Sequence, residues 1–357
     1  MKSGGTPKSR SDLFYSNNGI PFLAIPDMKN KYLLKTDKHI TNLAVEKTST
    51  FIFEKDNLIY SIYATIGEIS INKIDVALPQ SILGIKADKS VIKNEYLYYL
   101  LKSNKNKILR LKQTGSQPNL SLEIFKNINL YLSLNLEEQE KIAKFFSLLD
   151  LQISLLENKL QLIEQIKKFI FSLDLEYDNK KINDCFNLYD GFPFKPSDYD
   201  FSGKQILTIK NILINKIDTT IINKTLKNID KKYEINKNDI ICALTGASGF
   251  KFSLSNDVYY FNQRTLKITS KNNDLEEIFL LLLLFNKQKD FISNLATGSQ
   301  KNISKKEIEN IFLLKKTKRN ILISKLLNKL IKYEKLLLLK KEFKLKQKKY
   351  FLENLFI

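Results

Sequence analysis

The feature that most constrains this chain is a repeat of its own sequence. Residues 114–121 (TGSQPNLS) recur as residues 297–304 (TGSQKNIS), at an offset of 183 residues from Thr114 to Thr297. Other segments match at the same offset, give or take one residue: 19–25 with 203–209, 55–59 with 237–241, and 127–128 with 310–311. A colinear series of matches at one offset indicates a tandem duplication and therefore two similar domains.

Both copies have the same predicted order of elements. Short strand-like runs, broken by Gly, Pro and Asn turns, come first and a helical stretch follows. The expected strands are residues 22–25, 58–63 and 81–85 in copy one, and 206–209, 240–244 and 265–268 in copy two. The expected helices are residues 95–111 and 275–295. The predicted fold class is therefore α/β, with two similar domains in 357 residues.

A long helix is expected to follow each copy. In the first helix, apolar residues recur every seventh position, at Ile142, Leu149, Leu156, Ile163 and Ile170. Such a seam needs a partner helix. The second helix is expected from about residue 320, with its seam at Ile323, Leu326, Leu330, Tyr333 and Leu337. Because the helices occupy equivalent places in the repeat, we expect them to pair with each other; ordinary core helices are the alternative.

The charge of the chain favours a polyanionic partner. The formal net charge is +20, and each Lys or Arg that neutralises a phosphate releases a counterion. Only four of these basic residues are arginines, at positions 10, 110, 264 and 319. An AT-rich gene would also give many lysines without selection for DNA binding, so both explanations stay open.

Cysteine content and hydropathy indicate where the protein is expected to act. Cys185 and Cys242 are too far apart for a short metal-ligand spacing and are expected to be reduced thiols. No signal peptide is recognised after Met1. The longest apolar run, residues 278–285, is much shorter than the ~20 residues that span a bilayer. We therefore expect a soluble, cytoplasmic protein with no membrane partner.

Short segments along the whole chain form a recognisable series. In the first half they are GGTP, GIPFLAI, DNLIYSIYATIGEI, LPQS, TGSQPNLS and NLEEQEKIAKFFSLLDLQISLLE. In the second half they are DGFPFKP, NDIICALTGASGF, FNQRTLKI and TGSQKNIS. In this order the segments resemble the specificity subunits of type I restriction–modification enzymes. The resemblance implies two target recognition domains separated by long helices that form an antiparallel coiled coil. Each domain would read one half of a bipartite site in double-stranded DNA.

The resemblance also implies the partners. The helices would recruit two modification (methyltransferase) subunits, and restriction subunits would join through the complex. S-adenosylmethionine, ATP and Mg²⁺ are expected only on those partners, so this chain is expected to hold no cofactor and no metal. The expected domains are recognition domain 1 (residues 1–134), a central spacer helix (135–179), recognition domain 2 (180–317) and a C-terminal spacer helix (318–357).

Two departures from the family pattern stand out. Copy two has residues 180–189 before its Gly-Phe-Pro turn, whereas copy one has almost nothing before Gly4, so the first domain is expected to be shortened at its N-terminus. The Glu-Glu-Gln of the first long helix is replaced by residues 320–322 (Asn-Ile-Leu) in the second. We therefore expect the two subunit-docking surfaces to differ.

The repeat sorts the candidate DNA contacts. Residues identical in both copies cannot explain two different half-sites, so these are expected to close turns or to contact phosphates. They are Ser116, Gln117 and Asn119 with Ser299, Gln300 and Asn302, and Gln263 with its counterpart Gln80. Base readout is expected from polar loop residues that differ. They are Lys8, Ser9, Arg10, Tyr63, Thr65 and Ser81 in copy one, and Lys195, Ser197, Thr245, Ser248, Lys251 and Arg264 in copy two.

Arg264 is the most specific of these candidates. Arginine pairs with guanine through two hydrogen bonds, to O6 and N7. The alternative is a structural salt bridge beside Gln263.

Partner binding is expected on the long helices. The candidate residues are Glu138 and Gln139 at the start of the first helix, with the apolar rows Ile142, Leu149, Leu156, Ile163 and Ile170, and Leu330 and Leu337. The Lys-rich stretch at residues 340–349 is interpreted as a solvated helix face; contact with phosphates or with an acidic partner is the alternative.

Catalytic motifs are missing from the sequence. The only histidine, His39, lies in a Lys-rich loop, and a lone exposed histidine is rarely a general base. The chain has neither a G-x-x-x-x-G-K-[ST] loop nor the Asn-Pro-Pro-aromatic motif of amino-methyltransferases. We therefore expect a non-catalytic subunit; the alternative is a standalone nuclease or methyltransferase with divergent motifs.

Overall fold

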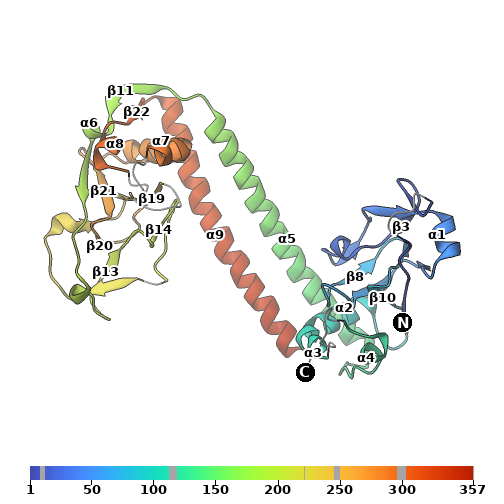
Figure 1. The fold of residues 1–357 in the computed structure, drawn as a ribbon. Helices are drawn as coiled ribbons and strands as arrows, with labels where there is room; N and C mark the ends of the chain where they lie inside the picture. The colour runs from blue at the N-terminus through green and yellow to red at the C-terminus, as the bar shows by residue number, and fades with distance from the viewer. Residues whose placement is uncertain (9–12, 112–118, 221, 245–249, 296–302, 357) are drawn as a thin grey trace. The chain divides into compact units, whose positions relative to one another are not determined.

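The computed structural model describes residues 1–8, 13–111, 119–220, 222–244, 250–295 and 303–356 (Figure 1). It divides into two compact units. Unit 1 comprises residues 1–157 and 340–357, and unit 2 comprises residues 158–339. Each unit contains one copy of the repeat together with part of both long helices.

Unit 1 is built on two five-stranded sheets. Their strand orders are β1-β10-β7-β8-β4 and β2-β5-β3-β9-β6. The strands are β1 (Lys2–Ser3), β2 (Tyr15–Ser16), β3 (Ile20–Phe22), β4 (Tyr32–Leu33), β5 (Lys38–Ile40), β6 (Ile52–Phe53), β7 (Asn57–Ser61), β8 (Ile69–Asn72), β9 (Val76–Ala77) and β10 (Ile82–Ile85). The helices are η1 (Ile25–Asp27), α1 (Asn42–Lys47), α2 (Asn94–Ser103), α3 (Lys105–Leu109), α4 (Leu122–Lys126) and the long α5 (Leu136–Ser172).

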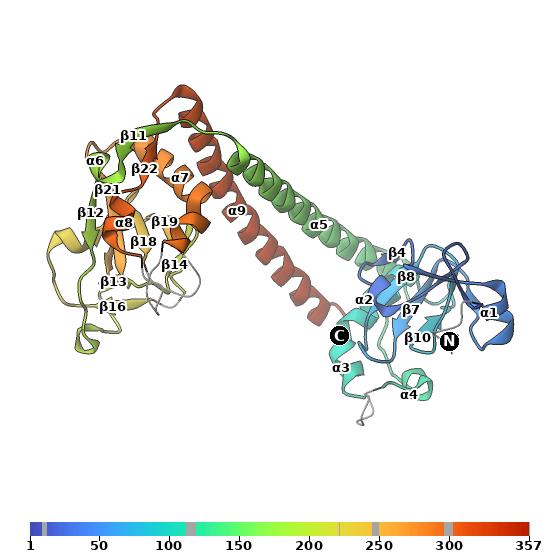
Figure 2. The same ribbon diagram turned by 45° about the horizontal axis from the view of Figure 1, so that its top comes forward.

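Unit 2 contains two four-stranded sheets, β12-β21-β18-β19 and β16-β13-β20-β17, and the strand pairs β11-β22 and β14-β15. The strands are β11 (Tyr177–Lys181), β12 (Phe186–Asp190), β13 (Lys204–Leu207), β14 (Ile212–Leu213), β15 (Lys216–Ile217), β16 (Asn223–Thr225), β17 (Glu234–Ile235), β18 (Ile240–Ala243), β19 (Lys251–Leu254), β20 (Tyr259–Phe261), β21 (Thr265–Ser270) and β22 (Phe312–Leu314). The helices are α6 (Ile182–Cys185), η2 (Pro196–Asp198), η3 (Lys231–Tyr233), α7 (Leu275–Asn294), α8 (Lys305–Glu309) and the long α9 (Lys318–Asn354). Both views show α7 beside the first part of α9 (Figures 1 and 2).

The duplication predicted from the sequence is confirmed by the strand register. Leu83 of β10 pairs with Tyr60 of β7, and in unit 2 Leu266 of β21 pairs with Cys242 of β18. The chain after each TGSQ segment forms the same backbone hydrogen bond in both units. The amide of Leu120 donates to the Ile62 carbonyl, as that of Ile303 donates to the Leu244 carbonyl, both at 2.9 Å. Equivalent residues of the two copies can therefore be compared directly.

The predicted strands and helices are largely confirmed, but the strand expected at residues 22–25 is β3 (Ile20–Phe22), and Ile25 belongs to η1. The helix expected at residues 95–111 is split into α2 and α3, with Asn104 between them. The first strand is also shorter in unit 1. Ser3 of β1 pairs with Leu83, and in unit 2 Asp190 of β12 pairs with the equivalent Leu266. The two residues of β1 therefore correspond to the last two residues of β12.

The seam predicted for α5 is confirmed. Leu149, Leu156, Ile163 and Ile170 are buried, and Ile142 is half-buried. The carboxamide oxygen of Asn135 accepts hydrogen bonds from the amides of Glu137 and Glu138 at 2.9 and 3.2 Å, so this residue caps the helix.

The seam predicted for α9 is only partly right. Leu337 is buried and Leu330 is half-buried, but Leu326 and Tyr333 are 47% and 45% exposed. The buried Leu327 and the half-buried Glu334 take their places in the row. Since α9 carries leucines on several faces, apolar spacing alone does not identify the one that packs.

Ion pairs define how the long helices run. In unit 1, Asp150 pairs with Lys348, and Glu157, seven residues further along α5, pairs with Lys341, seven residues back along α9. The helices are therefore antiparallel there, as expected. Lys341 and Lys348 belong to the stretch interpreted as a solvated face, so that interpretation is wrong for these two residues.

A partly buried ion pair joins the helices in unit 2. The ammonium of Lys167 lies 3.0 Å from a Glu334 carboxylate oxygen and 2.6 Å from one of Glu164. Burial alone would lower the pKa of Lys167, but its hydrogen bonds with Glu164 and Glu334 raise that pKa above its usual value.

Within the described residues, no helix is long and apolar enough to cross a membrane.

We predict that Phe146→Ala destabilises unit 1. Phe146 is fully buried, and its ring stacks on those of Tyr99 and Phe356 at centroid distances of 4.9 and 5.7 Å. Its truncation should lower the free energy of unfolding, measured in urea, by about 3–5 kcal/mol. The control is Leu148→Ala on the same helix, which should change it by less than about 0.5 kcal/mol because Leu148 is 51% exposed. Equal losses would contradict this packing.

Candidate nucleic-acid interface

In unit 1, four predicted contact residues come together at one end of a sheet. Tyr63 and Thr65 follow the end of β7, and Ser81 precedes β10 beside it. The amide of Ile62 donates to the Ser81 carbonyl at 2.9 Å, and Tyr63 forms an isolated β-bridge with Asn119. The structure therefore places Tyr63, Thr65, Ser81 and Asn119 in one region.

Ser61 closes the loop that carries two of these residues, which we call the 62–67 loop. The buried Ser61 hydroxyl donates to the Thr65 carbonyl at 2.5 Å and accepts from the Glu68 amide at 2.8 Å. The backbone of Ser61 adds hydrogen bonds to the Gly67 amide and the Glu68 carbonyl. Both ends of the loop are thus tied to one residue, which limits its motion.

The loop also contains an unusual backbone conformation. Ala64 has a φ of 55°, in the left-handed region that residues other than glycine rarely adopt. Such strain costs roughly 1–3 kcal/mol and persists only where the surroundings enforce it, often at functional sites. The hydrogen bonds of Ser61 provide that enforcement.

A cleft lies beside the 62–67 loop, and we call it the unit 1 cleft. Its volume is about 550 Å³, and its walls are mainly apolar. Thr65 and Ser81 line it together with Thr6 and the exposed lysines Lys29 and Lys38. Lys8 is exposed two residues beyond Thr6 and outside this lining.

In unit 2, Gln263 and Arg264 form the turn between β20 and β21, and both are exposed. Arg264 is the structural counterpart of Ser81, because the next residues, Thr265 and Ile82, pair with equivalent partners. In the described part of the chain, no carboxylate lies within ion-pair distance of Arg264. The structure thus offers no support for the alternative that its side chain forms a structural salt bridge.

Other predicted residues lie around this turn. Lys251 pairs with Ala243, which pairs on its other side with Thr265, so Lys251 and Arg264 lie at the same end of the sheet. Lys195 and Ser197 are exposed at η2. Phe192 connects η2 with the turn, since its carbonyl accepts from the Gln263 amide and its ring lies 5.0 Å from the ammonium of Lys227, which pairs with Asp198.

Nine of the predicted DNA contacts lie outside the described residues. They are Ser9, Arg10, Ser116, Gln117, Thr245, Ser248, Ser299, Gln300 and Asn302.

The structure gives Gln139 an internal role instead of an exposed one. Its side chain is fully buried, accepts from the Lys93 amide and donates to the Val91 and Ser133 carbonyls, at 2.7–2.9 Å. The neighbouring Glu138 remains exposed. In unit 2 the buried Asn320 donates to the Glu176 and Lys315 carbonyls in the same way. Each long helix thus has a buried carboxamide near its start that donates to backbone carbonyls.

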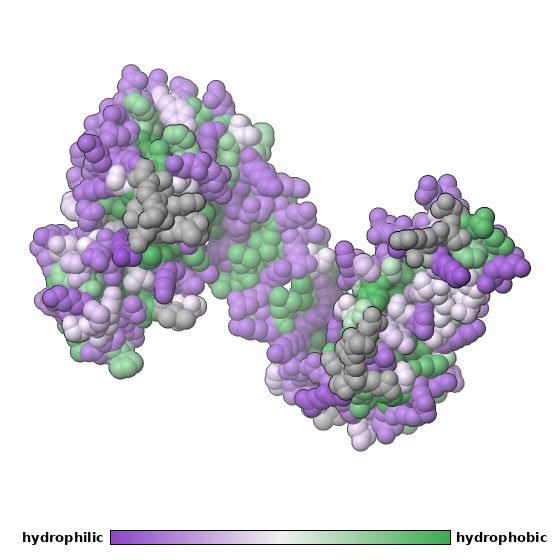
Figure 3. Space-filling model, viewed as in Figure 1, coloured by the Kyte–Doolittle hydropathy of each residue, from purple (hydrophilic) through white to green (hydrophobic). Residues whose placement is uncertain are grey.

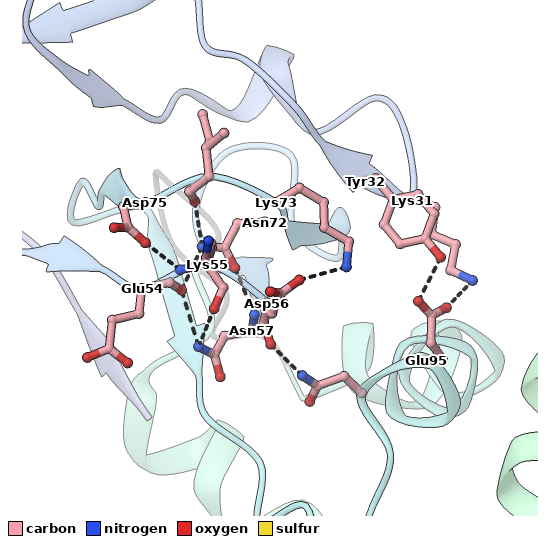
Figure 4. Close-up of polar contacts among 12 residues, drawn as sticks. Lys31, Tyr32, Glu54, Lys55, Asp56, Asn57, Asn72, Lys73, Asp75 and Glu95 are labelled. Atoms are coloured by element: carbon pink, nitrogen blue, oxygen red, sulfur yellow. Dashed lines mark hydrogen bonds and ion pairs between the residues drawn. The ribbon is translucent and has the colours of Figure 1, made fainter.

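A polar network that the sequence analysis missed fastens the unit 1 sheets to the long helices. Lys31 and Tyr32 both point to Glu95 on α2 (Figure 4). The Lys31 ammonium also donates to the hydroxyl of Ser147 on α5 at 2.7 Å.

Tyr99 extends this network, because its hydroxyl donates to the Asp150 carboxylate at 2.8 Å. Burial raises the pKa of Tyr99 far above its usual value, so the phenol stays protonated and can donate. At the 183-residue offset of the repeat, copy two has Leu282, and the signal in the sequence is this tyrosine-to-leucine difference.

Comparison with known proteins agrees with this architecture. A sequence model of the family described as "Type I restriction modification DNA specificity domain" matches residues 1–165 and 175–313. The type I restriction enzyme MjaIX specificity subunit of Methanocaldococcus jannaschii is 30% identical over 179 residues, which are 48% of this chain and 40% of that protein. The EcoR124I/EcoR124II specificity subunit of Escherichia coli is 26% identical over 159 residues, 41% of this chain and 37% of that protein. These alignments therefore span less than half the length of either relative.

A solved structure agrees over a longer stretch. The crystal structure of the S subunit of a type I restriction–modification system from M. genitalium has a TM-score of 0.68 at 16% identity, and covers 100% of this chain and 93% of that one. At this identity the likeness establishes the fold. Since the family model matches most of the sequence, in both copies of the repeat, the chain belongs to the type I restriction modification DNA specificity domain family.

Proposed function

We propose that this chain is the non-catalytic DNA-reading subunit of a type I restriction–modification complex and that it acts in the cytoplasm. Residues 1–134 and 180–317 are the two recognition domains, and residues 135–179 and 318–357 are the spacer helices. One observation carries the proposal: two copies of one fold present different polar residues, such as Ser81 and Arg264, at the same place. Two such domains suit a bipartite site in double-stranded DNA.

The basic surface accounts for general DNA affinity. With a net charge of +20, lysines such as Lys8 and Lys195 neutralise phosphates and release counterions. Phosphate contacts position the protein, and base edges in the major groove supply the sequence information. The residues that differ between the copies read these edges. The shared residues of the TGSQ segments contact DNA phosphates or close their own turns.

The long helices carry a second apolar row in addition to the buried seam. In α5, Leu148, Leu155, Leu162 and Phe169 each precede a seam residue and are each more than half exposed. In α9, four apolar residues spaced by seven or fourteen positions are likewise more than half exposed: Leu322, Leu336, Phe343 and Tyr350. Figure 3 shows apolar surface along these helices. A heptad row that faces solvent is a seam for a further helix.

We assign that further helix to a modification subunit, one for each unit of this chain. Restriction subunits join through the same complex. S-adenosylmethionine, ATP and Mg²⁺ bind to these partners, which perform methyl transfer and cleavage, while this chain needs no cofactor. The spacer helices hold the catalytic partners beside the half-sites that the recognition domains read.

We predict that the purified chain binds duplex DNA with strong salt dependence and without turnover. If the chain contacts 6–10 phosphates, its affinity for DNA should fall about 10³–10⁵-fold when the salt concentration rises from 50 to 200 mM. Fluorescence anisotropy measures this, and incubation of DNA with S-adenosylmethionine and Mg²⁺ should yield no methylated or cleaved product. Turnover by the chain alone would favour a standalone methyltransferase or nuclease. A flat salt dependence would favour a helical adaptor whose charge reflects coding bias.

We predict that Leu162→Glu weakens the binding of the modification subunit at least about ten-fold, since it places a charge in the exposed apolar row. Gln161→Glu is the matched control, because it adds the same charge at the adjacent exposed position outside the row. Titration calorimetry measures both affinities, and both variants should melt like the wild type. Equal affinities would remove the row as the docking surface.

A further inference from the structure

We infer that the unit 1 cleft receives the methyl group of a thymine, so that the first domain reads an A·T pair where the second domain reads a G·C pair through Arg264. The inference rests on the proposed function and adds to it the chemical class of base that each half-site contains. It follows from comparing one position, Ser81 and Arg264, in two copies of the same fold.

The lining of the cleft suits the major-groove edge of an A·T pair. Phe22, Met28, Ala64 and Pro79 supply apolar walls, and Thr65 and Ser81 supply hydroxyl groups. In the major groove thymine presents a methyl group and the O4 acceptor, and adenine presents the N6 donor and N7 acceptor. An apolar cleft with adjacent hydroxyls can bury the methyl group while a hydroxyl bonds to O4 or N6.

Hydrogen bonds hold the wall of the cleft in one shape, which favours discrimination between bases. Ser61 ties both ends of the 62–67 loop, and Ala64 is held at a φ of 55° where it lines the cleft. A site whose geometry is set before binding loses less conformational entropy when it binds its ligand. Copy two has Ala243 at the position of Ser61, so it lacks the hydroxyl that closes the loop.

Charge favours DNA over other occupants of this cleft. Lys29 and Lys38 lie at the cleft with exposed side chains. The acidic member of the lining, Glu68, is neutralised by Lys105 at 2.9 Å. The net charge around an apolar lining is therefore positive, which suits a base flanked by phosphates.

The second domain offers different chemistry at the same place. Arg264 is exposed, and in the described part of the chain no carboxylate pairs with it, so its guanidinium is free to form two parallel hydrogen bonds. Guanine, with O6 and N7 side by side, is the base edge that matches this pattern. Ser81 cannot reproduce that contact, and Arg264 offers no methyl-accepting surface.

The test uses the complex of this chain with its modification subunit. Sequencing of methylated adenines first gives both half-sites for the wild type and for Arg264→Ala. The half-site that loses a guanine preference in the variant belongs to the second domain. In duplexes of the wild-type site, each thymine of the other half-site is then replaced by deoxyuridine, and the methylation rate is measured.

We expect deoxyuridine at one thymine to lower the rate about four-fold, because one buried methyl group contributes ~0.8 kcal/mol. Thr65→Ser removes a methyl group from the cleft wall. In this variant, the ratio of the methylation rates with thymine and with deoxyuridine should approach one. A half-site in which no thymine responds to the replacement would overturn the inference and leave the proposed function standing. A complex that assembles but methylates no DNA would overturn both.

Discussion

Packing between the two long helices is the interaction on which the rest of the structure depends. Both long helices contribute to the core of each unit, and unit 1 takes the end of α9 from the far end of the sequence. In unit 1, Phe351 of α9 packs edge-on against Phe145 of α5 at a centroid distance of 5.0 Å, and Phe356 stacks on Phe146. In unit 2, Ile170 of α5 belongs to the same core as Leu327 of α9. Removal of either helix would therefore expose apolar surface in both units.

The duplication places two different surfaces on one backbone. Strand register and loop closure are repeated between the copies, so the polar residues at the ends of β10 and β21 vary while the framework stays the same. The junction with the helices varies as well: Lys31, Glu95, Tyr99 and Asp150 form a polar network in unit 1, whereas copy two has Leu282 in place of Tyr99. The ion pair of Lys31 with Glu95 is only partly buried, so it contributes little net stability.

Much of this architecture could be predicted from local patterns. The repeat, the strands β18 and β21, the helix α7 and the seam of α5 all follow from periodicity and from matched segments. The register of α9 could not be predicted, because Leu326 and Leu327 are adjacent leucines and only tertiary contacts decide which one is buried. The interior roles of Gln139 and Ser61 were also invisible, since their partners are backbone groups that the fold brings near. In the candidate site, the convergence of Tyr63, Thr65, Ser81 and Asn119 required the structure, although each residue was identified from its difference or identity between copies.

The central claim is that two copies of one domain read two separate half-sites for partner subunits. It is tested most directly by expressing this chain with its modification subunit and mapping every methylated adenine in the host genome. The account predicts a split motif, with two short specified sequences separated by a spacer of fixed length and unspecified sequence. One contiguous motif, or no methylation by a complex shown to assemble, would contradict it.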